Sequence, residues 1–305
     1  MNRARHFLAV ASTSRARWLA LLEQTRALAR GEAHVPSLRG HNVVTLFLEP
    51  STRTRASFEL AARRLGADVV DLSPSSSSLV KGESLLDTAR NLEAMGADAI
   101  VVRHRVSGTP TRLAPLLRAS VVNAGDGTNE HPTQALLDCA TILAHKERIE
   151  GLRIAIVGDV LHSRVARSDA RAFAMLGAHV RLCGPPSLVP EALGALGAEV
   201  THDLDCALEG ADVVVALRLQ HERQQSGLVT SLRDYRMGWG IDARRWRRTA
   251  PGAILMHPGP VHRGVEVDSD LADGPQSVIL EQVRWGLFAR MAVLADCLDG
   301  TPTEA

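Results

Sequence analysis

Short apolar segments alternate with segments of helical periodicity along most of the 305 residues, and this alternation limits the possible folds more than any other feature. The apolar segments are brief and rich in β-branched residues, as buried parallel strands are. Strands are predicted at residues 43–48, 68–72, 98–103, 121–122, 153–157, 179–183, 198–201, 212–217 and 253–256. Helices are predicted at 14–29, from 52, and at 84–95, 111–118, 133–146 and 276–298. Such alternation predicts an α/β fold in which parallel sheets carry helices on both faces.

Gly151 interrupts this pattern after a first set of strands, and the alternation then starts again. A chain of 305 residues usually forms two domains or one large one. We therefore predict two doubly wound parallel-sheet domains, residues 1–150 and 151–275, followed by a closing helix. In open sheets of this kind, ligands bind beyond the carboxyl ends of the strands. The cleft between two such edges is the expected active site.

The composition is that of an ordinary globular protein, with 45% apolar and 23% charged residues. The formal net charge is +1, so the protein has no strongly basic field that would attract nucleic acid or an acidic membrane. Aromatic residues make up 3%, which disfavours a surface for stacking bases. We therefore expect no nucleic-acid and no membrane partner. The apolar run from Phe7 to Ala11 is too short for a signal segment. We expect a cytoplasmic enzyme without a metal or other cofactor. The four cysteines are predicted to be reduced core thiols, and they are Cys139, Cys183, Cys206 and Cys297.

The stretch Ser51-Thr52-Arg53-Thr54-Arg55 lies at the predicted turn from the strand 43–48 into a helix. A helix N-terminus presents free N–H groups and the positive end of the helix dipole, which suits an anion such as phosphate. Three hydroxyls add hydrogen-bonding groups there, and Arg53 adds a forked positive charge. The alternative is an ordinary N-cap beside solvated arginines, but a cap accounts for one hydroxyl only. The pattern therefore favours an anion-binding site.

Arg103 directly follows the apolar segment 99–102, and His131 and Gln134 frame the start of a helix. Because His131 and Gln134 are three residues apart, both can reach one small ligand. From the residues alone, Arg103 and His104 are as easily structural as functional, and a single histidine is more often structural.

The segment 154–159 is similar to the first strand of a Rossmann domain, but no Gly-x-Gly-x-x-Gly pattern follows it. This absence argues against a nicotinamide-dependent enzyme.

Several of these segments resemble motifs of the aspartate/ornithine carbamoyltransferase family, the transcarbamoylases. The resemblance extends from residue 49 to residue 264 and includes the His-Pro-x-Gln segment at 131–134 and the His-Pro-Gly-Pro segment at 257–260. It is strongest to the aspartate-specific members, because the His-Cys-Leu-Pro and Asp/Met-rich motifs of ornithine enzymes are missing. It implies the transcarbamoylase fold, with a last helix at about 276–299 packed on the first domain. It also implies the transfer of a carbamoyl group from carbamoyl phosphate to L-aspartate, an early committed step of pyrimidine (UMP) biosynthesis.

The resemblance also assigns roles to individual residues. Arg53, Arg103 and Lys81 would stabilise the leaving phosphate, and His131 and Thr54 would stabilise the oxyanion. The implied carbamoyl-phosphate ligands are Ser51, Thr52, Arg53, Thr54, Arg103, His131, Gln134, Gly259 and Pro260, with Ser77 and Lys81 from a neighbouring subunit. The implied aspartate ligands are Lys81, Arg164, Arg218 and Gln220.

Two of these assignments conflict with a simpler interpretation of the residues. The composition of residues 75–83 alone favours an ordinary surface loop, whereas the resemblance makes this loop part of the neighbouring active site. Gly259 stands where some relatives carry leucine, which leaves the side-chain packing at that position in doubt.

The resemblance also implies a homotrimer in which this loop enters the site of the neighbouring chain, and larger assemblies with regulatory chains or a dihydroorotase stay open. Two alternatives to aspartate carbamoylation also stay open. One is a carbamoyltransferase that uses ornithine or a derivative, and the other is a non-catalytic structural paralogue.

Overall fold

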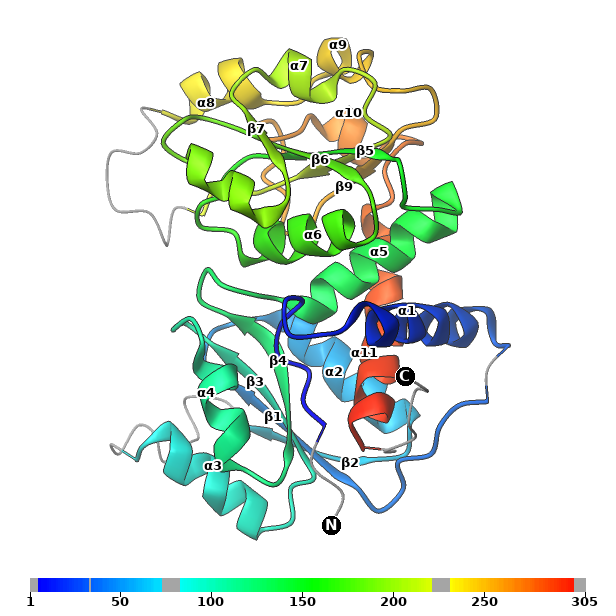
Figure 1. Ribbon diagram of the computed structural model, residues 1–305, viewed down its shortest axis with the longest axis vertical. Coiled ribbons are helices and arrows are strands. Elements are labelled where there is room, and N and C mark those ends of the chain that lie inside the picture. Colours follow the sequence, from blue (N-terminus) through cyan, green and yellow to red (C-terminus); the bar gives the residue numbers. More distant parts are fainter. Residues whose placement is uncertain (1–4, 33, 73–82, 221–230, 299–305) are drawn as a thin grey trace. The chain divides into compact units, whose positions relative to one another are not determined.

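The computed structural model describes residues 5–32, 34–72, 83–220 and 231–298 (Figure 1). The chain divides into two compact units. Unit 1 comprises Met1–Ala140 and Val283–Ala305, and unit 2 comprises Thr141–Gln282. The chain passes from one unit to the other within two helices, α5 (Pro132–Lys146) and α11 (Ile279–Leu298).

Unit 1 contains a four-stranded parallel sheet with the strand order β2-β1-β3-β4. Its strands are β1 (Asn42–Phe47), β2 (Asp68–Leu72), β3 (Ala99–His104) and β4 (Ser120–Asp126). Its helices, besides the parts of α5 and α11, are α1 (Arg15–Arg30), α2 (Thr52–Arg64), α3 (Leu85–Ala94) and α4 (Thr109–Leu113). The strand order reverses between β1 and β3, which is the usual position of a ligand site in doubly wound sheets.

Helices cover both faces of this sheet (Figure 1). One face packs against α3 and α4, where Val44, Leu46 and Ile100 of the strands meet Leu92 and Leu113. The other face lies against α1, α2 and α11. Because both faces are covered, β1 is buried along nearly its whole length rather than at alternate residues.

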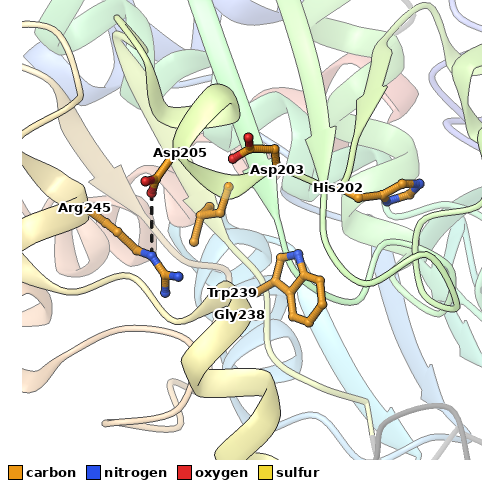
Figure 2. A pocket seen from close by; sticks show the side chains of 7 residues that line it. His202, Asp203, Asp205, Gly238, Trp239 and Arg245 are labelled. Carbon is orange, nitrogen blue, oxygen red and sulfur yellow. Dashed lines mark ion pairs between the residues drawn. The ribbon is translucent and has the colours of Figure 1, made fainter.

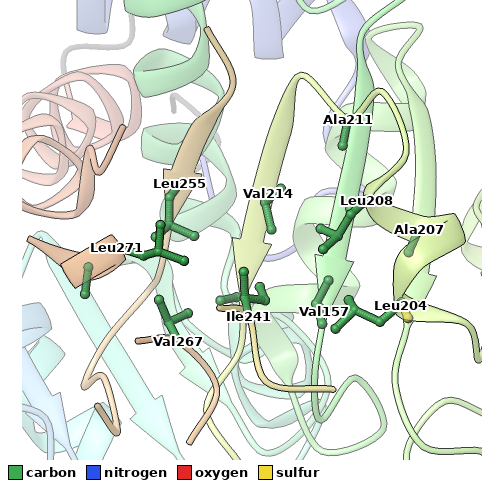
Figure 3. Packing of buried hydrophobic residues seen from close by; sticks show 14 residues of the cluster. Val157, Leu204, Ala207, Leu208, Ala211, Val214, Ile241, Leu255, Val267 and Leu271 are labelled. Carbon is green, nitrogen blue, oxygen red and sulfur yellow. The ribbon is translucent and has the colours of Figure 1, made fainter. Parts of the chain in front are cut away.

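Unit 2 contains a five-stranded parallel sheet with the order β7-β6-β5-β8-β9, which reverses between β5 and β8. Its strands are β5 (Arg153–Val157), β6 (His179–Cys183), β7 (Glu199–Thr201), β8 (Val213–Ala216) and β9 (Ile254–Met256). Its helices include α6 (Arg164–Met175), α7 (Leu204–Leu208), α8 (Leu232–Trp239), α9 (Ala243–Trp246) and α10 (Ser269–Ala272), with a 3₁₀ helix η4 (Glu191–Leu196). Figure 3 shows strand residues Val157, Val214 and Leu255 packed against Leu208 of α7 and Leu271 of α10.

The predicted α/β class and all nine strands are confirmed, and two elements differ from the expectation. The strand predicted at 121–122 is longer and extends over all of β4. The polar residue Asn123 interrupts the apolar pattern, but its side chain is buried and donates to Leu8 O and to Asp126. The helix predicted at 111–118 stops at Leu113 and continues as the 3₁₀ turn Ala114–Leu116. Pro115 lacks a backbone N–H and cannot continue an α-helix.

The cysteines are all free, and three of them are buried as predicted, but Cys206 is exposed. Burial raises the pKa of the Cys183 and Cys297 thiols to about 12. Cys206 lies in the short helix α7, whose inner face is occupied by Leu204, Ala207 and Leu208. None of the described helices is long and apolar enough to cross a membrane.

Candidate active site

Three neighbouring strands of unit 1 carry the predicted carbamoyl-phosphate ligands beyond their carboxyl ends. Ser51 to Thr54 follow β1, Arg103 stands near the end of β3, and His131 follows β4 after a short loop. The β1–β3 register pairs Phe47 with Arg103, and Leu48 N–H donates to Arg103 O at 2.8 Å. The fold therefore brings these three segments to one edge, at the reversal of the strand order.

Ser51 is the N-cap residue of α2, yet its side chain makes no capping hydrogen bond. The N-cap serines Ser14, Ser84, Ser163 and Ser231 all accept a backbone N–H from their helices. The Ser51 hydroxyl therefore does not cap the helix. The start of α2 still has the features of an anion-binding site. At this start Thr54 is buried, whereas Thr52 and Arg53 are exposed.

The two arginines of this stretch have different surroundings. Arg55 forms ion pairs with Glu59 at 3.6 Å and with Asp71 at 3.5 Å, which gives it a structural role. Arg53 is exposed at the first turn of the helix. The first turn of α2 therefore exposes Arg53, whereas Arg55 is engaged in ion pairs.

The Arg103 guanidinium is held from two sides. Its Nη1 donates to Ala124 O of β4 at 3.1 Å, and its Nη2 lies 3.5 Å from Oε1 of Glu49. Its side chain is 11% exposed, so the charge lies at the sheet edge but within the protein surface. A guanidinium fixed in this way is ready to bind a phosphate without reorganisation.

The His104 ring is held by hydrogen bonds within its own loop. Its Nδ1 accepts the backbone N–H of Val106 at 2.9 Å and lies 3.0 Å from the Thr109 hydroxyl. Burial lowers the pKa of His104 below its ordinary value, so the ring is neutral near pH 7.

His131 is buried at the entrance to α5, and its carbonyl accepts the N–H of Gln134 at 2.9 Å. The preceding loop is organised by Asp126, which is fully buried. Asp126 accepts from the Asn129 amide at 3.1 Å and from Glu130 N–H at 3.1 Å. Asp126 therefore sets the path of the chain between β4 and His131.

Unit 2 repeats this arrangement at the ends of β5, β8 and β9. Arg164 is the first residue of α6 and is buried, with Ser163 capping the helix. Arg218 Nη2 donates to Oε1 of Gln220 at 3.3 Å, so these two predicted aspartate ligands lie together. Asp159, fully buried after β5, accepts Gln220 N–H at 3.1 Å and thereby ties the chain after β8 to the chain after β5.

The turn after β9 holds Gly259 and Pro260, which are joined by a cis peptide bond. Gly259 has a φ of +68°, a left-handed conformation that favours glycine. Its N–H donates to Nδ1 of His257 at 2.8 Å. The backbone at Gly259 is therefore held by its hydrogen bond to His257, although Gly259 has no side chain of its own.

Ser77 and Lys81, the residues expected from a neighbouring subunit, lie outside the described residues. Among the residues that are described, no cluster of three or more His, Cys, Asp or Glu side chains could hold a metal ion.

A pocket of about 390 Å³ in unit 2 contains none of the predicted ligands. Figure 2 shows it between the start of α7 and the end of α8, with Arg245 directed at Asp205, 3.7 Å away. Its other lining residues are His202, Asp203, Leu204, Gly238 and Trp239.

The sequence analysis missed the acidic residues that position the predicted ligands. These residues are Asp126, Asp159 and Glu266, all of them buried. The first two directly follow Gly125 and Gly158 at the end of apolar segments, and that signal could have identified them.

Two family models match the chain and together account for most of its length. One, described as "Aspartate/ornithine carbamoyltransferase, carbamoyl-P binding domain", matches residues 5–144. The other, described as "Aspartate/ornithine carbamoyltransferase, Asp/Orn binding domain", matches residues 150–297.

Individual relatives agree with these matches. The aspartate carbamoyltransferase catalytic subunit of Granulibacter bethesdensis is 55% identical over 95% of this chain and 93% of its own length. Aspartate transcarbamoylase from Trypanosoma cruzi, solved with carbamoyl aspartate and phosphate, superposes with a TM-score of 0.85 at 31% identity, covering 97% of each chain. Ornithine carbamoyltransferase from Pyrococcus furiosus superposes with a TM-score of 0.87 at 30% identity, covering 98% of each chain. The fold is thus shared by enzymes with two different acceptors.

Proposed function

The chain belongs to the aspartate/ornithine carbamoyltransferase family, and from this premise we propose that it transfers the carbamoyl group of carbamoyl phosphate to L-aspartate. The products are N-carbamoyl-L-aspartate and phosphate, and the reaction is an early committed step of de novo pyrimidine (UMP) biosynthesis. The role of each residue below is part of the same proposal.

The observation that carries the choice of aspartate is the contact between Arg218 and Gln220, at 3.3 Å, beyond the end of β8. A guanidinium presents a rigid fork that matches a carboxylate, and aspartate brings two carboxylates. Arg164, at the start of the α6 helix after the neighbouring strand β5, supplies a second guanidinium on the same sheet. Ornithine would bring an additional ammonium group to this positively charged edge, and the repulsion disfavours it.

Carbamoyl phosphate would bind at the edge of unit 1. Ser51, Thr52, Arg53 and Arg103 bind its phosphate, and Lys81 of a neighbouring subunit neutralises charge as the phosphate leaves. His131 and Thr54 donate to the carbonyl oxygen as it becomes negative, and each donor of this kind is worth about 3–4 kcal/mol. Gln134 and the Gly259 and Pro260 carbonyls accept from the amino groups.

The neutral aspartate amine attacks the carbonyl carbon, the C–O bond to phosphate breaks, and the departing phosphate takes the amine proton. No covalent enzyme intermediate or cofactor takes part. Holding two small reactants in line can supply roughly 7–11 kcal/mol of the barrier. The protein therefore acts by orientation and by charge that is already in place.

The active unit would be a homotrimer, because Ser77 and Lys81 complete the site of the next chain. Larger assemblies with regulatory chains or a dihydroorotase are compatible with this arrangement.

The test is a colour assay of the purified chain with carbamoyl phosphate and either L-aspartate or L-ornithine. We expect N-carbamoyl-aspartate and little citrulline, and we expect His131→Ala to lower the aspartate reaction at least about a hundredfold. If citrulline were the main product, the acceptor would be ornithine and not aspartate. No product with either amino acid would favour the non-catalytic paralogue.

A further inference from the structure

The side-chain amide of Gln134 has one fixed orientation. Its Nε2 lies 3.1 Å and 3.2 Å from the two carboxylate oxygens of Asp138, one helical turn further along α5. An ionised carboxylate accepts hydrogen bonds and donates none. The NH₂ group of Gln134 therefore faces Asp138, and its carbonyl oxygen is left as the group that can bind a ligand.

Asp138 is fully buried, and its charge is balanced by Arg290 of α11, itself only 4% exposed. Burial lowers the pKa of Arg290 to about 10, against the effect of the Asp138 charge, so the guanidinium stays protonated near pH 7. Its carbon Cζ lies 5.2 Å from the ring centre of Phe58 in α2. One buried cation thus links the two helices whose first turns carry the proposed carbamoyl-phosphate ligands.

Gly286 in α11 makes space for this guanidinium. A Cβ atom at Gly286 would collide with Nη1 of Arg290 and would lie 3.2 Å from Leu137 of α5. Glycine inside a helix costs about 1 kcal/mol relative to alanine. The close approach of Arg290 to α11 explains why glycine stands here.

We propose that Asp138 and Arg290 are positioning residues that make the carbamoyl site selective for an amino group, by holding the Gln134 carbonyl oxygen as a hydrogen-bond acceptor. This inference rests on the proposed function. The carbamoyl group and the acetyl group have nearly the same shape, but –NH₂ donates a hydrogen bond and –CH₃ does not. If the amide of Gln134 could turn over, its NH₂ would face the substrate amino group, and the preference would be lost.

Acetyl phosphate is the probe for this selectivity. The measured quantity is the ratio of the inhibition constant of acetyl phosphate to the KM of carbamoyl phosphate, with L-aspartate as acceptor. The variants are Asp138→Asn, which lets the amide pair turn over, and Arg290→Met. The double variant Asp138→Asn/Arg290→Met removes both buried charges together, so it leaves no unbalanced charge if a single variant fails to fold. Ile142→Val, a buried residue of the same helix, is the matched control.

We expect the ratio to fall roughly three- to tenfold in the variants, the equivalent of one hydrogen bond, and to stay unchanged in Ile142→Val. A loss of affinity for both phosphates in equal proportion would overturn the inference, because it would show a merely structural role. In that case the wild-type chain would still form N-carbamoyl-aspartate, and the proposed function would stand. A wild-type chain that forms none would contradict the proposed function and this inference with it.

Discussion

Nε2 of His257 lies 3.3 Å from Oε1 of Glu266, and both side chains are fully buried in unit 2. His257 accepts the Gly259 N–H through Nδ1 at 2.8 Å, so the ring proton is on Nε2 and is donated to Glu266. Glu266 also accepts His262 N–H at 2.8 Å. The pair therefore holds both ends of the turn that presents Gly259 and Pro260.

Removing the Glu266 carboxylate should destabilise this turn. In Glu266→Ala, the His257 ring and the His262 N–H lose a buried acceptor, so we expect the free energy of unfolding to fall by roughly 2–4 kcal/mol. Urea titration measures this change. Glu209→Ala is the control, because Glu209 is 66% exposed and pairs with Arg248 on the surface at 3.4 Å. Its effect should stay within about 0.5 kcal/mol, and equal effects of the two substitutions would show that the turn does not depend on Glu266.

The two substrates should depend on different arginines. Arg218→Ala is expected to raise the KM for aspartate at least about tenfold while changing the KM for carbamoyl phosphate little, because a charged hydrogen bond to a carboxylate is lost. Arg103→Ala should have the opposite pattern. Steady-state kinetics with each substrate varied in turn measures both constants. Equal changes in the two constants for either variant would contradict the division of ligands between the units.

Mixed trimers test the shared site. Lys81→Ala chains and His131→Ala chains should each be inactive alone, yet a trimer that contains both types has about one intact site in three. We therefore expect activity to return when the two variants are unfolded and refolded together. Verified mixed trimers that remain inactive would refute the contribution of Lys81 to a neighbouring site.

The partly buried ring of His104 predicts a loss of stability in acid. Its pKa in the folded protein is lowered, chiefly by burial, so below the ordinary value of about 6.5 the unfolded chain binds a proton that the folded chain does not. The free energy of unfolding should thus fall between about pH 7.5 and pH 5.5. His104→Asn keeps an acceptor for Val106 N–H and should reduce this fall, whereas the exposed His34→Asn should not. An identical pH dependence in all three proteins would exclude His104 as a cause.

Apolar segments and helical periodicity predicted the strands well, because strands such as β1, β5 and β8 are buried along most of their length and few buried polar residues interrupt them. β4 is the exception, since its buried polar residue Asn123 donates to Asp126 nearby in the chain and to Leu8 O, which is distant in sequence. The position of Ser51, Arg103 and His131 near strand ends could also be predicted, because parallel strands place such residues on one edge.

The tertiary contacts of the residues behind the site could not be predicted. Arg290 is about 150 residues from Asp138 along the chain, and nothing local in the sequence pairs them. The same holds for Asp159, which receives the backbone N–H of Gln220 from a different strand. Local patterns identify the groups that face a ligand, and tertiary contacts decide which buried charges hold those groups in place.

The central claim is that unit 1 binds the phosphate group of carbamoyl phosphate and that unit 2 binds the two carboxylates of aspartate. An experimental structure of the protein with N-(phosphonacetyl)-L-aspartate, which joins a phosphonate to aspartate, tests it most directly. The account predicts the phosphonate at the start of α2 within hydrogen-bonding distance of Ser51, Thr54 and Arg103, and the carboxylates on Arg164 and Arg218. A phosphonate bound away from Arg103, or carboxylates bound away from both Arg164 and Arg218, would contradict it.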